Sequence, residues 1–455
     1  MLKLKKDVNM LSGSIVKGLL TIALPIMVMN IIQSLFNIID MRVLKTFASN
    51  ENAVGAVGVC GTLITLITGL LVGCSSGANV VIARLIGKRS LEESKKAVGV
   101  SILFALFGGV ILSVIGIAFA EIFLGWMNCH EDLLPQAALY FRLYFAGVPI
   151  LMVYNFCAAI LRSTGDSRRP MLYLTTGGVL KVLFNLLFVG VLDLAVVGVA
   201  LATIISWSTS CALGLRAVFK NPNEYARLEL SKIRLHKREL SDILTIGIPT
   251  GLQQALYSIA NVIISATVNR FGAEATTGIS IANNFDGILY QIAVAPSLAV
   301  MPYVSQNLGA DNLKRAKQSV VRGMMITISF AATIGALSAI FSGQLSSILS
   351  SNPEVIKYSQ QKMVIISSTY FLCGINEIVG AALKGFKRPI VPMVSTMIFM
   401  CGIRFIWVYL IFPYYENLTF LYLIWPIGWT LSIITLLCFY VPTVRGNWKK
   451  RFGNY

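Results

Sequence analysis

The sequence predicts an all-α polytopic membrane protein with twelve transmembrane helices in two six-helix bundles related by a parallel internal repeat. Three observations support this fold class. Of the 455 residues, 56% are apolar and only 13% are charged, which excludes a soluble protein with an ordinary surface. The charges lie in clusters between long apolar runs, and similar segments recur about 222 residues apart. Duplicated apolar chains are typical of secondary transporters, whose two halves flank a site near the middle of the membrane.

Each predicted span is an apolar run that can cross the hydrocarbon core, which takes roughly 20 helical residues. The first half has spans near residues 15–40, 54–82, 97–124, 138–160, 171–192 and 195–218. The second half has spans near residues 242–268, 277–304, 320–345, 360–382, 390–412 and 419–441. The predicted domains are therefore an N-terminal bundle (1–218), a cytoplasmic linker (219–240) and a C-terminal bundle (241–455).

The repeat is clearest in the loops. Gly87 and Gly309 each precede a cluster of Lys and Arg residues, and Pro170 recurs as Pro392 at the same spacing. Because each half holds an even number of spans, the two halves share one orientation in the membrane. The repeat is therefore parallel, about an axis along the membrane normal.

The formal net charge of +18 has an explanation in topology. With both termini in the cytoplasm, most of the 38 Lys and Arg residues lie on that side, while the opposite loops are mainly acidic, with Arg42 and Lys45 among their few basic residues. This is the positive-inside bias of a multi-pass protein, here of a bacterial cytoplasmic (inner) membrane. Nucleic-acid binding is not needed to explain the charge, and membrane lipid is the expected surrounding partner.

The sequence contains no recognisable motif for catalysis or for binding a cofactor. Eight Cys and two His occur without a CxxC pair or metal-ligand spacing, so neither a metal site nor a disulfide framework is expected. No HExxH or phosphate-binding loop is present. The chain is therefore predicted not to be an enzyme and to need no cofactor, and any energy for transport comes from an ion gradient or a separate partner.

The first span carries a polar stripe. Asn30, Gln33, Asn37 and Asp40 follow steps of three, four and three residues, which place them on one helix face. An acidic stripe is costly against lipid, so it faces the bundle interior or a water-filled cavity, and Asp40 is a candidate functional residue. Hydrogen bonding between helices is the alternative role for the amides. Pro25, inside the same span, predicts a kink or hinge.

The seventh span repeats this design without the acid. Pro249, Gln254, Tyr257 and Asn261 follow the same pattern, and Ile264 occupies the position of Asp40. The polar lining is duplicated but the carboxylate is not. Ion coupling is therefore predicted in the N-terminal half, with Pro249 as the second hinge.

Further charged residues lie within the predicted spans. Lys181 and Asn185 are one turn apart in the fifth span, and a buried lysine needs a partner, for which Asp40 is the candidate. In the second half, Asp286 and Glu377 either line the substrate cavity or pair with Arg404. Structural pairing of these residues is the alternative to a role in transport.

With these residues in view, the chain resembles the multidrug and toxic compound extrusion (MATE) transporters, most closely the DinF-like branch. The resemblance covers nearly the whole chain and depends on the order of its motifs, which are Leu24-Pro25, Asp40, the Gly87 and Gly309 loops, Leu161 to Asp166 with Pro170, and Leu383-Lys384-Gly385. It implies two six-helix bundles that export cationic or amphipathic compounds in exchange for protons or sodium. It also implies a cation site in the N-terminal bundle, with Asp40 as its acid.

The chain departs from that branch in the fifth span. Lys181 and Asn185 stand where the branch often has an Asn and an Asp. This argues against a sodium site of several carboxylates, and a Lys181–Asp40 pair would supply internally the positive charge that a coupling cation brings elsewhere.

Three functions follow as hypotheses. The first is a proton-coupled, less favourably sodium-coupled, antiporter that exports organic cations or amphipathic drugs and metabolites, expected as a monomer. The second is a lipid-linked precursor flippase of the same superfamily, which Lys181 and Arg404 keep open. The third, a membrane enzyme or assembly factor, lacks any catalytic constellation.

Overall fold

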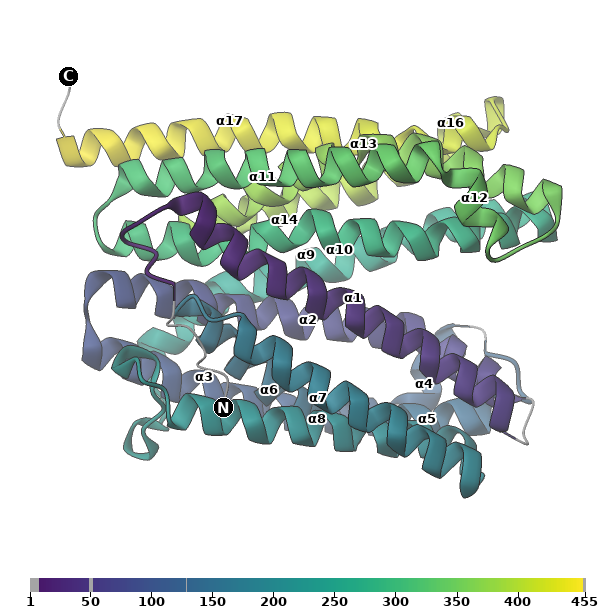
Figure 1. Ribbon diagram of the computed structural model, residues 1–455, viewed down its shortest axis with the longest axis horizontal. Coiled ribbons are helices and arrows are strands. Elements are labelled where there is room, and N and C mark those ends of the chain that lie inside the picture. The colour runs from purple at the N-terminus through teal and green to yellow at the C-terminus, as the bar shows by residue number, and fades with distance from the viewer. Residues whose placement is uncertain (1–7, 49–51, 128, 453–455) are drawn as a thin grey trace. The chain divides into compact units, whose positions relative to one another are not determined.

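The computed structural model describes residues 8–48, 52–127 and 129–452. The elements in these ranges are helices joined by short loops, which confirms the predicted all-α fold class (Figure 1). Within the described residues, ten helices are long and apolar enough to cross a membrane, or eleven if the bent pair α5 and α6 is counted as one span. Helix α9 (Lys237–Val268) occupies the place of the seventh predicted span.

The chain divides into two compact units. The first contains residues 1–8 and 28–247, and the second contains residues 9–27 and 248–455. Helix α1 (Ile15–Phe47) thus changes unit beside Pro25, and α9 changes unit beside Pro249. The predicted domain boundaries at 218 and 241 stay a prediction.

Between them, the two units hold the following elements. The remaining helices of the first unit are α2 (Asn52–Lys88), α3 (Leu91–Ala118), α4 (Ala120–Trp126), α5 (Leu134–Ala146), α6 (Val148–Ser163), α7 (Arg168–Asn185), the π-helical η1 (Leu186–Val191), α8 (Ala195–Phe219), η2 (Glu224–Ala226) and η3 (Leu230–Lys232). Those of the second are η4 (Asn269–Phe271), α10 (Ala273–Gly309), α11 (Leu313–Ile340), α12 (Ser342–Ser347), α13 (Pro353–Gly385), α14 (Ile390–Thr396), the π-helical η5 (Met397–Gly402), α15 (Ile403–Ile406), the π-helical η6 (Trp407–Ile411), η7 (Phe412–Tyr414), α16 (Leu418–Tyr422) and α17 (Ile424–Phe452).

The internal repeat is visible in the backbone. Helices α3 and α11 begin 222 residues apart and also end 222 residues apart. The turns repeat as well: Arg89 and Asp311 have φ angles of 58° and 62°, and Gly165 and Lys387 have 87° and 60°. A left-handed conformation is uncommon for residues with a side chain, so its recurrence at one spacing indicates a common ancestral unit.

Helix ends differ from the predicted spans at several places. Helix α1 continues to Phe47, so Arg42 and Lys45 lie on its last turns and not in a loop. The fourth predicted span is broken at Gly147, where α5 and α6 meet at 44°. Pro149 lies in the first turn of α6, where its missing N–H costs no helical hydrogen bond.

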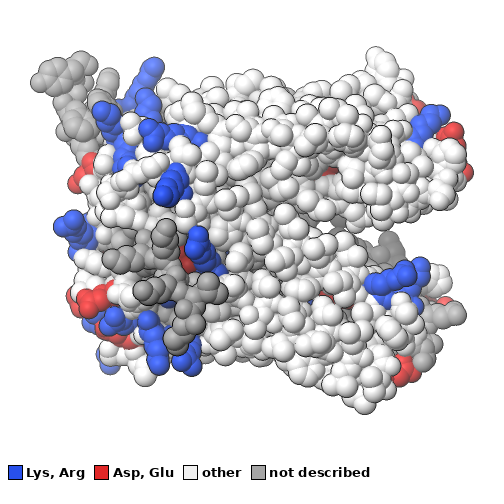
Figure 2. All heavy atoms as spheres, viewed as in Figure 1, with Lys and Arg blue, Asp and Glu red and all other residues white. Residues whose placement is uncertain are grey.

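Apolar side chains cover the outer flanks of the helices. On α3, Phe107, Ile111 and Val114 are all exposed and share one face. On the face that Figure 2 shows, charged atoms gather near the helix ends and the flanks between them are mostly uncharged. Such flanks are suited to contact lipid chains.

The predicted linker is folded onto its own unit. Lys95 on α3 pairs with Glu229 at 2.6 Å, and Glu92 pairs with Lys232 at 2.6 Å. Ser94 donates a hydrogen bond to the backbone oxygen of Tyr225. The segment after α8 is therefore a structured connection and not a free tether.

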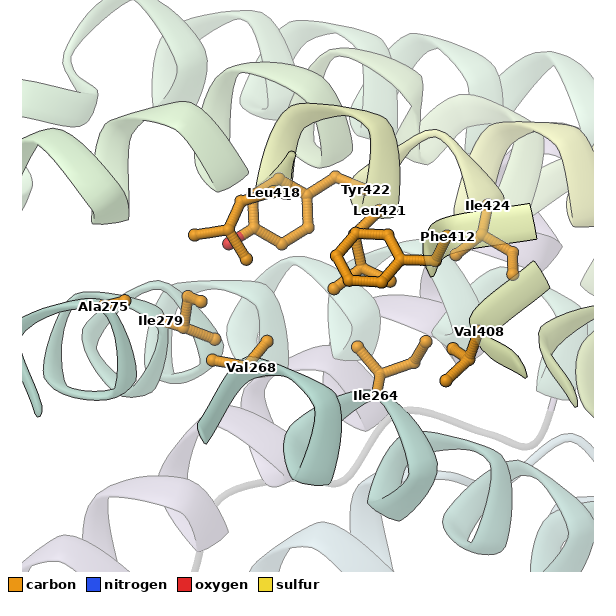
Figure 3. Packing of buried hydrophobic residues seen from close by; sticks show 10 residues of the cluster. All are labelled: Ile264, Val268, Ala275, Ile279, Val408, Phe412, Leu418, Leu421, Tyr422 and Ile424. Atoms are coloured by element: carbon orange, nitrogen blue, oxygen red, sulfur yellow. The ribbon is translucent and has the colours of Figure 1, made fainter. Parts of the chain in front are cut away.

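A buried apolar cluster lies where the second half of α9 meets α10, η6 and α16. Ile264 and Val268 of α9 face Leu421 and Tyr422 in this cluster, which Figure 3 displays. Ile264, at the position that corresponds to Asp40, is therefore part of a hydrophobic core. This explains why the second half has no acid there, because an unpaired carboxylate in such a core would be costly.

Candidate functional site

An ion pair between the buried Asp40 and the partly buried Lys181 joins α1 and α7 in the first unit. The carboxylate of Asp40 pairs through Oδ2 with Nζ of Lys181 and accepts a hydrogen bond at Oδ1 from Nδ2 of Asn185. Asp40 is 6% exposed and Asn185 is fully buried. The structure therefore brings together the three residues for which the sequence predicts a coupling role.

Two glycines allow the helices to approach closely enough for this pair. A Cβ on Gly178 of α7 would lie 1.9 Å from the ring of Phe36 on α1, and one on Gly177 would lie 2.6 Å from the backbone oxygen of Ser206 on α8. Helix α7 is therefore packed against α1 on one side and α8 on the other. Lys181 is one turn beyond Gly178, which places its side chain at the level of Asp40.

The α-helix changes to a π-helix directly after Asn185. Segment η1 begins at Leu186, so the hydrogen-bonding pattern widens beside the ion pair. π-Helical turns are rare and occur frequently at functional sites. In the second unit, η5 and η6 flank α15, which carries Arg404. The sequence analysis did not predict these segments.

The other members of the predicted polar stripe are more accessible than Asp40. Asn30 is partly buried, and Gln33 and Asn37 are exposed. The four residues therefore run from an accessible part of α1 down to the buried ion pair. Pro25 lies inside α1 and Pro249 inside α9, and both helices continue past the proline.

The second unit holds a hydrogen-bond network around Glu377 of α13. Tyr257 of α9 donates its hydroxyl to Oε1 of Glu377 at 3.4 Å and accepts from Nδ2 of Asn376 at 3.2 Å. Ser432 of α17 donates to Oδ1 of Asn376 at 2.6 Å. Three helices are thus joined by neutral donors around one buried carboxylate.

Asp286 pairs with a lysine that the sequence analysis did not single out. Nζ of Lys362 on α13 lies 2.8 Å from Oδ2 of Asp286 on α10, and it also bonds to Oδ1 of Asn283. Lys362 is 3% exposed. It was missed because the tenth span was predicted to begin near residue 360, at its rim, whereas α13 begins at Pro353. The signal that could have found it is the pair Asn283 and Asp286, three residues apart on one face of α10.

Arg404 pairs with neither of the carboxylates proposed for it. Its Nη1 donates to Oδ1 of Asn261 at 2.8 Å, and its guanidinium lies 4.9 Å from the ring centre of Trp425. Lys362 lies 5.8 Å from the same ring centre. The expectation of an Arg404 pair with Asp286 or Glu377 is therefore wrong, because Asp286 is engaged by Lys362 and Glu377 by Tyr257.

The glutamine predicted to line the second half is less buried than its neighbour. Gln254 is partly buried, whereas Gln253 is buried and donates to Oγ1 of Thr396 at 3.1 Å. Gln253 therefore joins α9 to α14. Gln254 is the member of the pair with a partly accessible side chain.

Buried charged pairs within duplicated bundles of membrane-spanning helices define the class of a multi-pass membrane transporter. The family model described as MatE matches residues 25–187 and 249–410, and the chain belongs to this family. Its members are transporters and not enzymes. The resemblance to the MATE family is thus confirmed, and the DinF-like branch stays a prediction.

Several known proteins are similar to the chain over most of its length. A probable multidrug resistance protein YoeA of Bacillus subtilis is 25% identical over 94% of this chain and 93% of its own. A FAD transporter of Shewanella oneidensis is 25% identical over 86% of each chain. An outward-facing multidrug resistance MATE family transporter matches with a TM-score of 0.89 at 20% identity over 98% of this chain and 100% of its own, which shows a shared fold.

Proposed function

We propose that the chain is a secondary active antiporter that exports organic cations or amphipathic drugs and metabolites across the cytoplasmic membrane, driven by a proton gradient. Asp40, Lys181 and Asn185 form the coupling site. The observation that carries this proposal is the ion pair of the buried Asp40 with the partly buried Lys181 on two neighbouring helices of the first unit.

A proton on Asp40 would break this ion pair. A buried carboxylate and ammonium stabilise each other, whereas one of them alone is costly inside a protein. Neutralising Asp40 leaves the ammonium of Lys181 without its counter-charge, so Lys181 must move toward water or another partner. Proton binding is thereby coupled to a shift of α1 against α7, with Pro25 and the π-helical η1 as the places where each helix can bend.

Sodium fits this site less well than a proton. A hard cation prefers several oxygen ligands, whereas both oxygens of Asp40 already face nitrogen donors. Lys181 occupies the place that a metal cation would take. A proton binds to a single carboxylate oxygen and is too small to require space that a side chain occupies.

Polar residues of each half, some accessible and some buried, are proposed to line a substrate cavity. These are Asn30, Gln33, Asn37, Gln254, Tyr257, Asn261, Asp286, Glu377 and Arg404, with Pro25 and Pro249 as hinges. Relatives named as multidrug resistance proteins and as a FAD transporter favour small amphipathic molecules over lipid-linked precursors. A bacterial cytoplasmic membrane, cytoplasmic termini and a monomeric state complete the proposal.

The test is transport into inside-out proteoliposomes with an imposed proton gradient and no sodium. A fluorescent organic cation and a fluorescent amphipathic anion are each supplied outside. We expect accumulation of at least one of them, its collapse with a protonophore, and its loss in the double variant Asp40→Asn/Lys181→Met. Uptake that needs sodium, or that survives in the double variant, would contradict the coupling role.

A further inference from the structure

Within the described part of the second unit, one buried cation has no carboxylate partner. Arg404 is 2% exposed, and its guanidinium contacts the neutral oxygen of Asn261 and the face of Trp425. Among the residues that the structure describes, Arg404 forms no ion pair. Its position in α15, between two π-helical segments, is fixed by backbone geometry that is rare in proteins.

The nearby charges do not cancel. Lys362 also lies over the ring of Trp425, and its charge is balanced by Asp286. Two cations and one carboxylate around one indole leave a net charge of one positive unit, that of Arg404. A buried, unbalanced guanidinium is costly, and a bound anion would remove this cost.

Among the described residues, the guanidinium has a hydrogen-bond partner at one of its donors only. An arginine offers five N–H groups in a planar fork that matches a carboxylate or phosphate, and Asn261 uses Nη1. Trp425 gives the same place a flat apolar surface against which an aromatic body can pack. Positive charge, free donors and an aromatic wall therefore occur together.

We propose that Arg404, Asn261 and Trp425 form a binding subsite for an organic anion, a carboxylate or phosphate group attached to an aromatic body. The inference rests on the proposed export function and narrows it: of the two substrate classes, it chooses amphipathic compounds with an anionic group over simple organic cations. Arg404 binds the anionic group, Trp425 packs against the ring, and Asn261 holds the guanidinium in place.

The experiment measures binding to the purified full-length protein in nanodiscs of neutral lipid, by calorimetry, without any gradient. The probes are 2-naphthoate, its neutral amide and 2-naphthylmethylammonium, which share one ring system and differ in charge. We expect naphthoate to bind about tenfold or more tightly than the amide, because a charge-assisted hydrogen bond is lost in the amide. The ammonium compound should bind more weakly still.

Two variants separate a binding role from a structural one. Arg404→Gln should weaken naphthoate about tenfold or more and leave the amide unchanged, and Arg404→Lys should restore part of the preference for the anion. Lys357→Gln removes an exposed positive charge from the same helix that carries Lys362, and it should change neither probe. Equal weakening of all three probes in Arg404→Gln would show a structural role and overturn the proposal, as would equal binding of naphthoate and amide, or no binding of naphthoate.

A membrane lipid is the other source of a phosphate group. Repeating the titration in nanodiscs that contain phosphatidylglycerol decides this point. If the wild-type protein binds naphthoate with the same affinity in both kinds of nanodisc, the ligand of Arg404 is a soluble substrate. If phosphatidylglycerol abolishes the binding of naphthoate but not that of the neutral amide, Arg404 binds a lipid headgroup instead. Because binding is measured at equilibrium, its result is independent of whether protons drive transport.

Discussion

The ring of Phe36 occupies the space next to Gly178, where a Cβ would lie 1.9 Å from ring carbon Cε2. This contact lets α1 and α7 approach, and Asp40 and Lys181 lie about one turn further along each helix. The ion pair therefore depends on the absence of a side chain at one position.

Replacing Gly178 by Ala should separate these helices. Forcing a methyl group into a packed contact costs about 1–3 kcal/mol, so Gly178→Ala should lower the midpoint of thermal unfolding and reduce transport. Adding Phe36→Leu, which removes the ring, should recover part of both. Gly61→Ala in α2, where nothing lies within 4 Å, is the control and should not destabilise the protein. An unaltered midpoint in Gly178→Ala would contradict the role of this contact.

Asp40 and Lys181 should behave as a coupled pair. Removing one partner of a buried ion pair costs about 3–5 kcal/mol, while removing both is nearly neutral. Asp40→Asn and Lys181→Met should each lower the free energy of unfolding, and the double variant should regain most of it. Transport should be lost in all three. Additive losses of stability would mean that the two side chains do not depend on each other.

The ion pair of Lys362 and Asp286 should stabilise the protein without coupling transport to protons. Lys362→Met should destabilise the protein by about 3–5 kcal/mol, because it leaves Asp286 unpaired, and adding Asp286→Asn should reverse this. Transport by the double variant should still collapse with a protonophore. Loss of the protonophore effect in this variant would instead place the coupling in the second unit.

The hydroxyl of Tyr257 should support the network around Glu377. Tyr257→Phe removes one donor to Glu377 and one acceptor from Asn376, so we expect a loss of about 1–3 kcal/mol in the free energy of unfolding. Tyr290→Phe on α10 is the matched control, because Tyr290, like Tyr257, packs against the buried cluster that contains Tyr370 and Trp429, and it should have the smaller effect. Equal effects would indicate that the hydroxyl of Tyr257 is not specifically required.

Properties that depend on residues close together in the sequence could be predicted from the sequence alone. Long apolar runs indicated the helices, the spacing of Gly87 and Gly309 indicated the repeat, and a step of three or four residues placed Asp40 on a polar face. The absence of an acid at Ile264 was also evident, although only the apolar cluster around it explains why. These predictions succeed because helix period and span length are set locally by backbone geometry and by the thickness of the hydrocarbon core.

The sequence by itself determined the fold class, the family and the residues that could carry charge inside the membrane. Only the tertiary structure decided which of them are partners. Asn185 meets Asp40 across 145 residues, and Lys362 meets Asn283 across 79, whereas Arg404 is left with a neutral partner. Which of these residues become partners depends on which helix faces pack against each other. That is determined by the packing of side chains such as Phe36 and Gly178 over the whole bundle, which no local pattern in the chain specifies.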